Sequence, residues 1–567
     1  MSTLPASDSD QCGYTKVAAL SFFGLAHITF GVGVSFSRTR RSRFWFSPSI
    51  HCRHMQTAQH RRLAVALAAF SLAALGMVLA SCSGSGSPAS VPPPSPATPL
   101  SAAEVDTVVQ HAVQSVDQPA VVAVTDRAGT VLAVFGTPGA PTTSTGNFGA
   151  IVDSHELAVA LARTAALFSN DQAPLSSRTV RFISGIHFPP GVAFAPNADL
   201  YGIENTNRGC PLNAVFNPGK AINPARSIDG SSLGLGVLTG KADVMDNNPT
   251  AVNPGGVPLF KNGHVVGGVG VVSTATDVAE FAAYSGASQA GFLPTAAQLP
   301  PPGVVIIGGI ALPFVNQTSL PAGVSTGSGG GSYIVGPIAG GLPPEADLIG
   351  PNAGTGGLAQ ADVAAIVTQA VSTASLTRAV IRLPSGSRTH MTIAVTDLDG
   401  TVLALHRMPD ATVFSIDVAV AKARNVIYFS GSAGAGDLPG VAAGTSVTNR
   451  TIGFGAQPLF PPGIDGSNPG PFFNLYSQDV ANPCSQGSQP ANPNQNGVVF
   501  FPGSLPLYKN GVLVGGLGVS GDGVDQDDYV TNASAQGFEA PTSIRADQLM
   551  IDSVRLPYLK FPRNPTD

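Results

Sequence analysis

Hydrophobic and polar positions along the chain predict the same series of elements twice. A capping box formed by Ser101 and Glu104 opens a run of apolar residues at helical spacing. Two apolar strands joined by a turn follow, and a second helix is predicted from about 155 to 168. A long irregular segment then extends to about residue 255, before a hairpin and a last helix. The series begins again at Leu358, so the chain carries an internal repeat.

The clearest repeated stretch is a predicted β-hairpin at residues 257–271 and 505–519. In both, an apolar run leads into Lys-Asn-Gly and is followed by a second apolar run. Asn-Gly is typical of a type I′ turn. The second run contains paired glycines in both copies, Gly267, Gly268, Gly515 and Gly516. Such bare backbone has two interpretations: close packing of a helix on the sheet, or a ligand lying against the strand.

The repeat predicts two homologous α+β domains, at residues 101–290 and 357–540. Each has the order α-β-β-α, a long insert and then β-β-α. Hairpin-linked strands favour an antiparallel sheet, which we expect to carry helices on one face. Residues 291–356 are predicted to be a Gly/Pro-rich linker without regular structure, and 541–567 a tail. Matched loops in the two copies favour packing about a pseudo-twofold axis, and a homo-oligomer could be built on this internal pseudo-dimer.

Composition narrows the function. Only 11% of the residues are charged, compared with about 25% in typical proteins. The 66 glycines and 48 prolines predict long irregular segments. The net charge of −5 comes with no basic block in the globular part, so nucleic-acid binding has no electrostatic support.

Residues 55–82 have the pattern of an export signal. Arg61 and Arg62 precede an apolar run that ends in Leu-Ala-Ser-Cys. This ending resembles the lipobox of bacterial lipoproteins. The resemblance implies cleavage before Cys82 and attachment of lipid, including palmitate, at Cys82. The alternative is a transmembrane anchor, for which the apolar run is short. The interpretation predicts an exported, membrane-anchored lipoprotein, periplasmic or at the cell surface.

The segments around this signal differ in character. Residues 1–54 contain an apolar stretch at 17–36 that could form a second span. Met55 gives a signal of ordinary length, so we expect residues 1–54 to be a doubtful N-terminal extension, translated upstream of the protein proper. Residues 83–100, rich in Ser and Pro, are expected to be a tether with no core of their own.

The repeated motifs together resemble the GlcG/HbpS family. The motifs are Val-Thr-Asp-x-x-Gly, Asp-x-Ala-x-x-Lys-Ala-Arg, and Pro-Leu-Tyr-x-x-Gly-x-x-Val-Gly-Gly-x-Gly-Val-Ser-Gly. The second copy is the closer match and keeps Asp417, Lys422 and Arg424; in the first, Leu161 replaces the lysine. That family includes haem-binding and proposed haem-degrading proteins and the C-terminal domain of a corrinoid adenosyltransferase. The resemblance implies a small-ligand pocket, with haem as the candidate ligand.

Several residues are candidates for a ligand site. Arg163 and Arg424 occupy equivalent helical positions; each either complements the helix dipole or faces a carboxylate-bearing ligand. The resemblance adds Asp417 and Lys422. A polar cluster in the first insert either makes turns or lines the mouth of a pocket: Tyr201, Glu204, Asn205, Asn207 and Arg208.

His187 is the best single candidate for a haem-iron ligand, since iron accepts His, Met, Cys or Tyr. The second copy has Leu459 at the corresponding place, and a solvated loop histidine is the competing interpretation. Asp126 and Asp397 begin tight turns, a structural role that explains them without a ligand.

Cys210 and Cys484 are the thiols that remain once the signal is removed and Cys82 is lipidated. Each follows a Leu-Tyr pair in its own copy. Equivalent positions meet only near a pseudo-twofold axis, so two outcomes stay open: a disulfide that clamps the domains, or two separate loop cysteines.

Three functions fit these observations. The first is a lipid-anchored, extracytoplasmic ligand-binding protein, with haem or another tetrapyrrole as the leading ligand. The second is an enzyme that degrades haem or acts on a small metabolite, but no Gly-x-Ser-x-Gly elbow, Walker loop or Rossmann fingerprint occurs in a suitable setting. The third is a structural or accessory module without a ligand.

Overall fold

The computed structural model describes residues 96–146, 149–184, 200–203, 210, 228, 253–300, 303–464 and 466–567. Residues Pro93–Asp567 form one compact unit that contains both copies of the repeat. In the described part of the chain, no helix combines the length and apolar character that crossing a bilayer requires.

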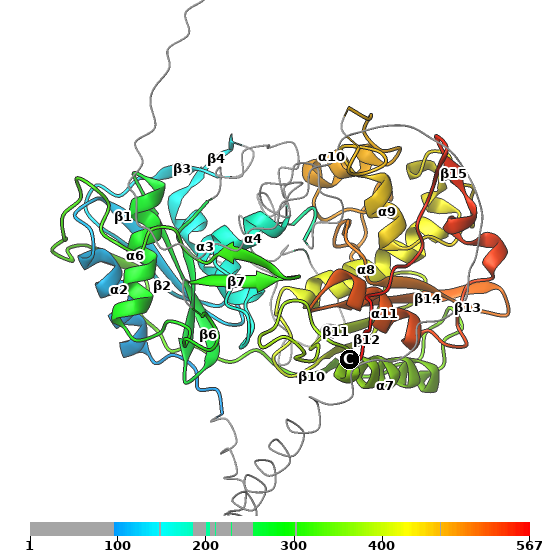
Figure 1. The fold of residues 1–567 in the computed structure, drawn as a ribbon, viewed down its shortest axis with the longest axis horizontal. Helices are drawn as coiled ribbons and strands as arrows, with labels where there is room; N and C mark the ends of the chain where they lie inside the picture. Colours follow the sequence, from blue (N-terminus) through cyan, green and yellow to red (C-terminus); the bar gives the residue numbers. More distant parts are fainter. Residues whose placement is uncertain are drawn as a thin grey trace, which may run out of the picture. The chain divides into compact units, whose positions relative to one another are not determined.

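Both copies build the predicted elements in the predicted order (Figure 1). The first copy contains α2 (Ala102–Gln114), β1 (Ala120–Asp126), β2 (Val131–Gly136), β3 (Thr143–Thr145), β4 (Ile151–Asp153), α3 (Ser154–Phe168), α4 (Ser177–Ser184), β5 (Gly256–Lys261), β6 (His264–Ser273) and α6 (Thr276–Gln289). The second contains α7 (Gln360–Leu376), β11 (Thr392–Thr396), β12 (Val402–Arg407), α8 (Ser415–Ser430), α9 (Asn449–Gly455), α10 (Phe473–Ala481), β13 (Ser504–Lys509), β14 (Val512–Ser520) and α11 (Val524–Ser534).

The two five-stranded sheets have matching strand orders, β5-β6-β1-β2-β9 and β13-β14-β11-β12-β10. All pairings between these strands are antiparallel, as the hairpin-linked sequence predicted. Asn262 and Asn510 have φ of 55° and 51°, and the glycines after them have φ of 84° and 78°. These positive values confirm the type I′ turns. The two hairpins therefore occupy equivalent sheet positions, as predicted.

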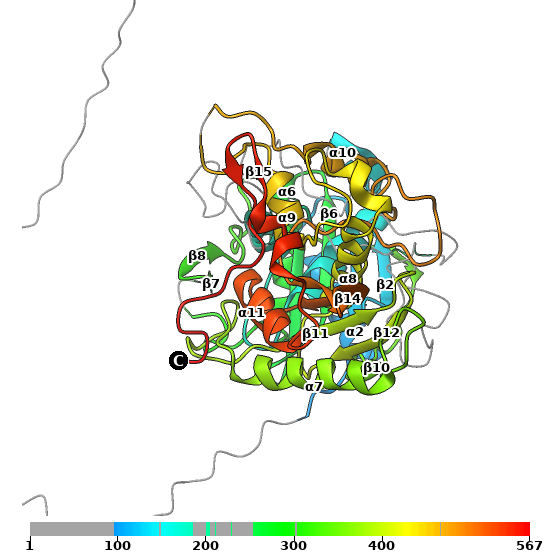
Figure 2. The same cartoon turned by 90° about the vertical axis from the view of Figure 1, so that its right-hand side faces the viewer.

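Helices cover both faces of each sheet, so the expectation of helices on one face is wrong. In the first copy, α2 packs beside α6 on one face, where Val122, Val124 and Val269 belong to the same core as α2. Helix α3 lies on the other face, against Val121 and Ala123. In the second copy α7 lies beside α11 (Figure 2). The strands are apolar on both faces because both are covered.

The paired glycines let helices α3 and α8 approach the sheets closely. A Cβ on Gly268 would lie 2.2 Å from the carbonyl oxygen of Ala162, and a Cβ on Gly516 would lie 2.2 Å from that of Ala423. Gly267 and Gly515 face backbone oxygens of the neighbouring strands. A Cβ added to Gly267 would lie 2.2 Å from such an oxygen, and a Cβ added to Gly515 would lie 2.6 Å from one. The backbone that these glycines leave bare is therefore covered by the protein itself, which supports the packing interpretation over a bound ligand.

The segment between the copies is more regular than expected. It contains β7 (Val304–Ile307), β8 (Ile310–Pro313), β9 (Ser332–Val335) and β10 (Ala346–Ile349). Strand β9 extends the first sheet beside β2, and β10 extends the second beside β12. The prediction that this Gly/Pro-rich segment has no regular structure is wrong for these strands, because a sheet edge supplies hydrogen bonds that sequence propensity does not reveal.

Two other segments also gain structure from their neighbours. The long insert, predicted as irregular, contains α4 in the first copy and α9 and α10 in the second. The C-terminal tail contains η3 (Thr542–Ile544), η4 (Ala546–Gln548), β15 (Met550–Ile551) and β16 (Val554–Arg555). Its end returns to the second domain, where the amide of Arg378 donates to the carbonyl of Pro565 at 2.7 Å.

Two kinds of ion pair, each present in both copies, explain residues that the repeat preserves. The lysine of each Lys-Asn-Gly turn reaches the acidic residue in the first turn of its copy's first helix. Lys261 lies 2.8 Å from Glu104, and Lys509 lies 2.5 Å from Asp362. In the inserts, Arg178 pairs with Glu280 at 2.7 Å, and Arg450 pairs with Asp528.

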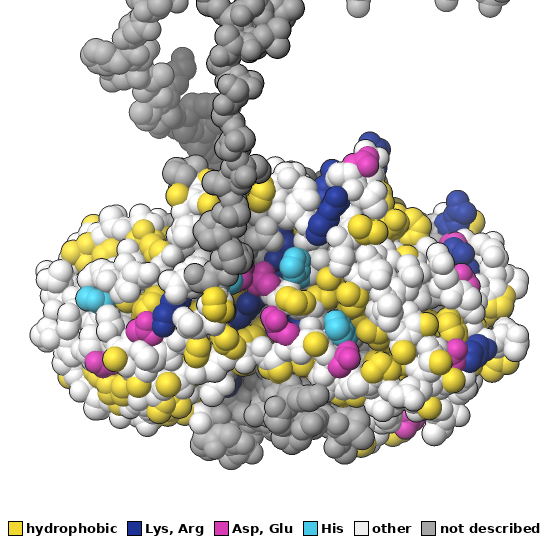
Figure 3. Space-filling view, turned by 90° about the horizontal axis from the view of Figure 1, so that it is seen from below, with side chains coloured by type: hydrophobic (Ala, Val, Ile, Leu, Met, Phe, Trp, Pro, Cys, Tyr) yellow, Lys and Arg dark blue, Asp and Glu magenta, His cyan; other side chains and the backbone are white. Residues whose placement is uncertain are grey.

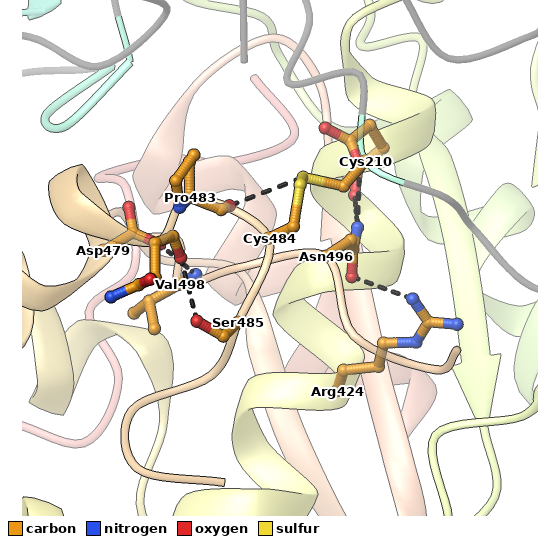
Figure 4. Close-up of a disulfide and its surroundings, with 10 residues drawn as sticks. Cys210, Arg424, Asp479, Pro483, Cys484, Ser485, Asn496 and Val498 are labelled. Carbon is orange, nitrogen blue, oxygen red and sulfur yellow. Dashed lines mark hydrogen bonds between the residues drawn. A yellow bond between two sulfur atoms is a disulfide. The ribbon is translucent and has the colours of Figure 1, made fainter. Parts of the chain in front are cut away.

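Equivalent residues of the two copies meet, as expected near a pseudo-twofold axis. Cys210 and Cys484 form a disulfide with a Cα–Cα distance of 5.5 Å, which settles the alternative left open by the sequence (Figure 4). Tyr201 stacks on its counterpart Tyr476 with ring centroids 6.0 Å apart. A further contact between the copies joins residues that are not equivalent: Phe168, at the end of α3, stacks on Phe414, just before α8, with ring centroids 4.3 Å apart.

A buried charge network also joins the copies. The carboxylate of Asp410 accepts hydrogen bonds from Arg127 of the first copy at 2.5 Å and from Arg382 of the second at 2.6 Å. Burial alone would raise the pKa of Asp410, but the two guanidinium groups hold it well below its ordinary value.

Candidate functional site

A cavity of about 360 Å³ lies in the first domain, between α3, the end of β6, the start of α6 and the β3–β4 hairpin. This volume falls in the lower part of the range typical of small-molecule pockets. Its described lining consists of Pro141, Thr143, Ser144, Thr145, Leu157, Leu161, Asn253, Pro254, Val271, Val272, Ser273, Thr274, Ala275, Thr276 and Ala279.

The cavity has an apolar floor and a hydroxyl-bearing rim. Leu157, Leu161 and Ala279 are buried, whereas Thr145 and Thr276 at the rim are exposed. None of the described lining residues carries a charged side chain. Such a surface suits a ligand that has an apolar body and hydrogen-bonding groups at one end.

Local interactions place these walls. Asp153 caps α3 by accepting from the amides of His155 and Glu156 at 2.8 and 3.1 Å. Strand β3 pairs with β4, and the hydroxyls of Ser144 and Ser154 lie 2.7 Å apart. The hairpin is thus tied to the amino end of α3, whose leucines form the floor.

The equivalent place in the second domain is filled by three large side chains. Matching the two Lys-Asn-Gly hairpins pairs Ala279 with Asp527 and Asn253 with Phe501; matching α3 with α8 pairs Leu161 with Lys422. The Nζ of Lys422 lies 2.9 Å from Asp527 Oδ2 and 4.8 Å from the centre of the Phe501 ring. All three residues are buried.

Burial controls the protonation of this filled site. Removal from water raises the pKa of Asp527 to about 7, although Lys422 acts in the opposite direction. Removal from water also lowers the pKa of Lys422. The ammonium group additionally donates to the carbonyl of Val519 at 2.8 Å. Lys422 is therefore held internally, and this contact explains its presence without a ligand.

The second domain also lacks the hairpin wall at this place. Residues 137–153 separate β2 from α3 in the first copy and include β3 and β4, whereas only residues 408–414 separate β12 from α8. The two copies share their sheets but differ in the residues at positions 161, 253 and 279 of the first copy and in the β3–β4 hairpin.

Arg163 and Arg424 brace the first hairpin of each copy, a role that neither sequence interpretation included. The Nε of Arg163 donates to the carbonyl of Gly129 at 2.8 Å, and that of Arg424 donates to Gly400 at 2.9 Å. Both arginines lie within their helices rather than near the ends, since α8 continues to Ser430. Burial lowers the pKa of Arg163 to about 10 and that of Arg424 to about 9.

Some of the remaining candidate residues contact other parts of the protein, and the others lie outside the described part of the chain. Asp417 accepts from the side chain of Asn496 at 2.8 Å. Asn496 in turn accepts from Arg424 at 3.0 Å (Figure 4). The hydroxyl of Tyr201 donates to Ala456 at 3.1 Å, so this tyrosine joins the copies and does not line the cavity. Six candidates lie outside the described residues: Cys82, His187, Glu204, Asn205, Asn207 and Arg208.

Sequence reasoning missed the cavity itself. The replacement of Lys422 by Leu161 was visible and is its clearest signal. An alignment of the last helices of the two copies shows the matching change from Asp527 to Ala279. Extending the alignment to the residues before the hairpins shows that Asn253 takes the place of Phe501.

Comparisons with known proteins match a part of the chain about as long as one copy of the repeat. A family model described as haem degrading protein HbpS-like matches residues 359–536. Similar solved structures include Klebsiella pneumoniae protein ORFY, at 20% identity over 31% of this chain and 88% of that chain, with a TM-score of 0.21. PduOC in complex with heme has 21% identity over 32% and 95%, with a TM-score of 0.21.

A double mutant of Streptomyces reticuli HbpS has 18% identity over 30% of this chain and 83% of that chain, with a TM-score of 0.18. A search of curated proteins gave no match. The fold and cavity define a two-copy α+β protein with a small pocket in one copy. Residues 359–536 form a GlcG/HbpS-like domain.

Proposed function

We propose that this chain is an exported, membrane-anchored protein that binds a small ligand. The observation that supports binding is the first-domain cavity, with its apolar floor and hydroxyl rim. Export and anchoring rest on the signal-like residues 55–82 and the lipobox-like ending at Cys82. Charged residues make up 11% of the chain, and Figure 3 shows their side chains scattered over this face, near the middle and toward both ends.

Haem or a related tetrapyrrole is the ligand class that the family description supports. The described lining of the cavity does not fit haem, because it includes no His, Met, Cys or Tyr to bind iron and no Lys or Arg to pair with propionates. A haem site in this protein therefore needs an iron ligand from outside the described lining. His187 is the candidate that the sequence offers.

The haem proposal predicts a shifted Soret band when micromolar haemin is added to residues 83–567, which include the whole compact unit. His187→Ala should weaken the shift, because a neutral imidazole is a strong iron ligand. His111→Ala, on α2, is the matched control. An unchanged Soret band in the parent protein would remove haem as the ligand and leave small-ligand binding to be tested with other compounds.

The anchoring proposal predicts that cells fed labelled palmitate incorporate it into the protein at Cys82. Cys82→Ser should abolish the label and release the protein from the membrane fraction. Cys12→Ser should retain both, because Cys12 precedes the predicted signal. Recovery of a soluble chain that begins at Met1 would contradict the proposal.

A further inference from the structure

Equivalent positions in the two copies differ: one is open and the other is filled. In the first domain the position is the cavity above Leu161 and Ala279; in the second it is occupied by Lys422, Asp527 and Phe501. The surrounding frame is the same, since the adjacent ion pairs Arg178–Glu280 and Arg450–Asp528 occur at equivalent places. The difference therefore lies in the filling side chains and the extra hairpin, not in the sheets.

We infer that, of these two equivalent positions, only the first domain's is open to a ligand, and that it takes one uncharged small molecule per chain. This inference rests on the proposed function and names the ligand class for its site. The second domain carries its own internal plug, made of the Lys422–Asp527 pair and the Phe501 ring.

The lining chemistry sets the ligand class. A charged group placed on the apolar floor would lose its hydration without gaining an ion pair, because no described lining residue carries a charge. The floor instead favours an apolar body of the ligand, through burial against Leu157 and Leu161. The hydroxyls of Thr143, Thr145 and Thr276 at the rim can donate or accept hydrogen bonds at the ligand's polar end.

The plug explains why the second position does not take the same ligand. Opening it would require displacement of Phe501 and would leave Lys422 and Asp527 to be solvated or separated. Asp527 is 2% exposed and Lys422 is 0% exposed. Breaking such a pair is costly, because each charge loses its partner while still buried.

The test uses two fluorescent probes with one ring skeleton. N-phenyl-1-naphthylamine is neutral, and 1-anilinonaphthalene-8-sulfonate carries an added sulfonate. We expect the neutral probe to bind residues 83–567 with a stoichiometry of one and about tenfold or more tighter than the anionic probe. Tighter binding of the anionic probe, or two equal neutral sites, would overturn the inference.

Variants then locate the site. Leu161→Lys combined with Ala279→Asp copies the charged pair of the plug into the first domain and should weaken neutral-probe binding about tenfold or more. Ala279→Leu fills the cavity without charges and should have the same effect if the charged variant does not fold. Circular dichroism and the unfolding midpoint verify folding. Unchanged affinity in a folded filled variant would overturn the inference.

The reverse variant tests the plug. Lys422→Leu, Asp527→Ala and Phe501→Asn together give the second domain the side chains of the first, and the stoichiometry should rise above one. A stoichiometry of one in this folded variant would show that the plug is not what closes the second position. If the parent protein binds haemin but not the neutral probe, only this ligand class is rejected. If the parent protein binds neither the neutral probe nor haemin, the proposed function is rejected as well.

Discussion

Replacement of both Cys210 and Cys484 by serine should lower the free energy of unfolding by about 4–5 kcal/mol. The bond joins residues 274 apart in sequence. A loop this long restricts the unfolded chain strongly, so its removal lies near the top of the range for single disulfides in the chain-entropy model. The bond also holds the insert of the first domain against the second.

Denaturant unfolding of residues 83–567 measures this effect. A reducing agent should shift the parent protein to the midpoint of the double variant and leave the double variant unchanged. Alkylation of protein taken from its native compartment provides the chemical check. Two freely alkylated cysteines there, or equal midpoints for the parent and the variant, would contradict the prediction.

Asp527→Ala should destabilise the second domain by about 3–5 kcal/mol, because it leaves the ammonium group of Lys422 buried without its carboxylate. The Phe501 ring, 4.8 Å from Nζ, offsets only a small part of this loss. Adding Lys422→Leu to the same chain should recover most of the stability, since the pair then matches Leu161 and Ala279 of the first domain.

The two variants are compared by denaturant unfolding at constant pH. The expected loss depends on whether Lys422 remains after its carboxylate is removed, so the double variant is the control for Asp527→Ala. A double variant less stable than Asp527→Ala alone would show that the lysine stabilises the domain through contacts other than the ion pair.

The sequence by itself determined the elements that depend on neighbouring residues. Ser101 and Glu104 predicted the start of α2, and both side chains form the capping box. Asn262 and Asn510 predicted the turns, since an Asn-Gly pair readily adopts the positive φ that a type I′ turn requires. The matched motifs then placed the same elements twice, and with them the antiparallel α+β fold.

Only the tertiary structure decided which distant residues meet. The sequence left the pairing of Cys210 with Cys484 open, and it gave Arg163 no role in bracing the turn at Gly129. Strands β9 and β10 form because each finds a sheet edge, which no local propensity describes.

The cavity is the clearest case. Its walls come from the β3–β4 hairpin, α3 and the β6–α6 junction, and Leu161 and Ala279 both line it although the two are far apart in sequence. A helix cap or a turn is an interaction over a few residues, so its signal is local. A cavity is the space left when separate elements pack, so its size depends on side-chain volumes at positions that only the fold brings together.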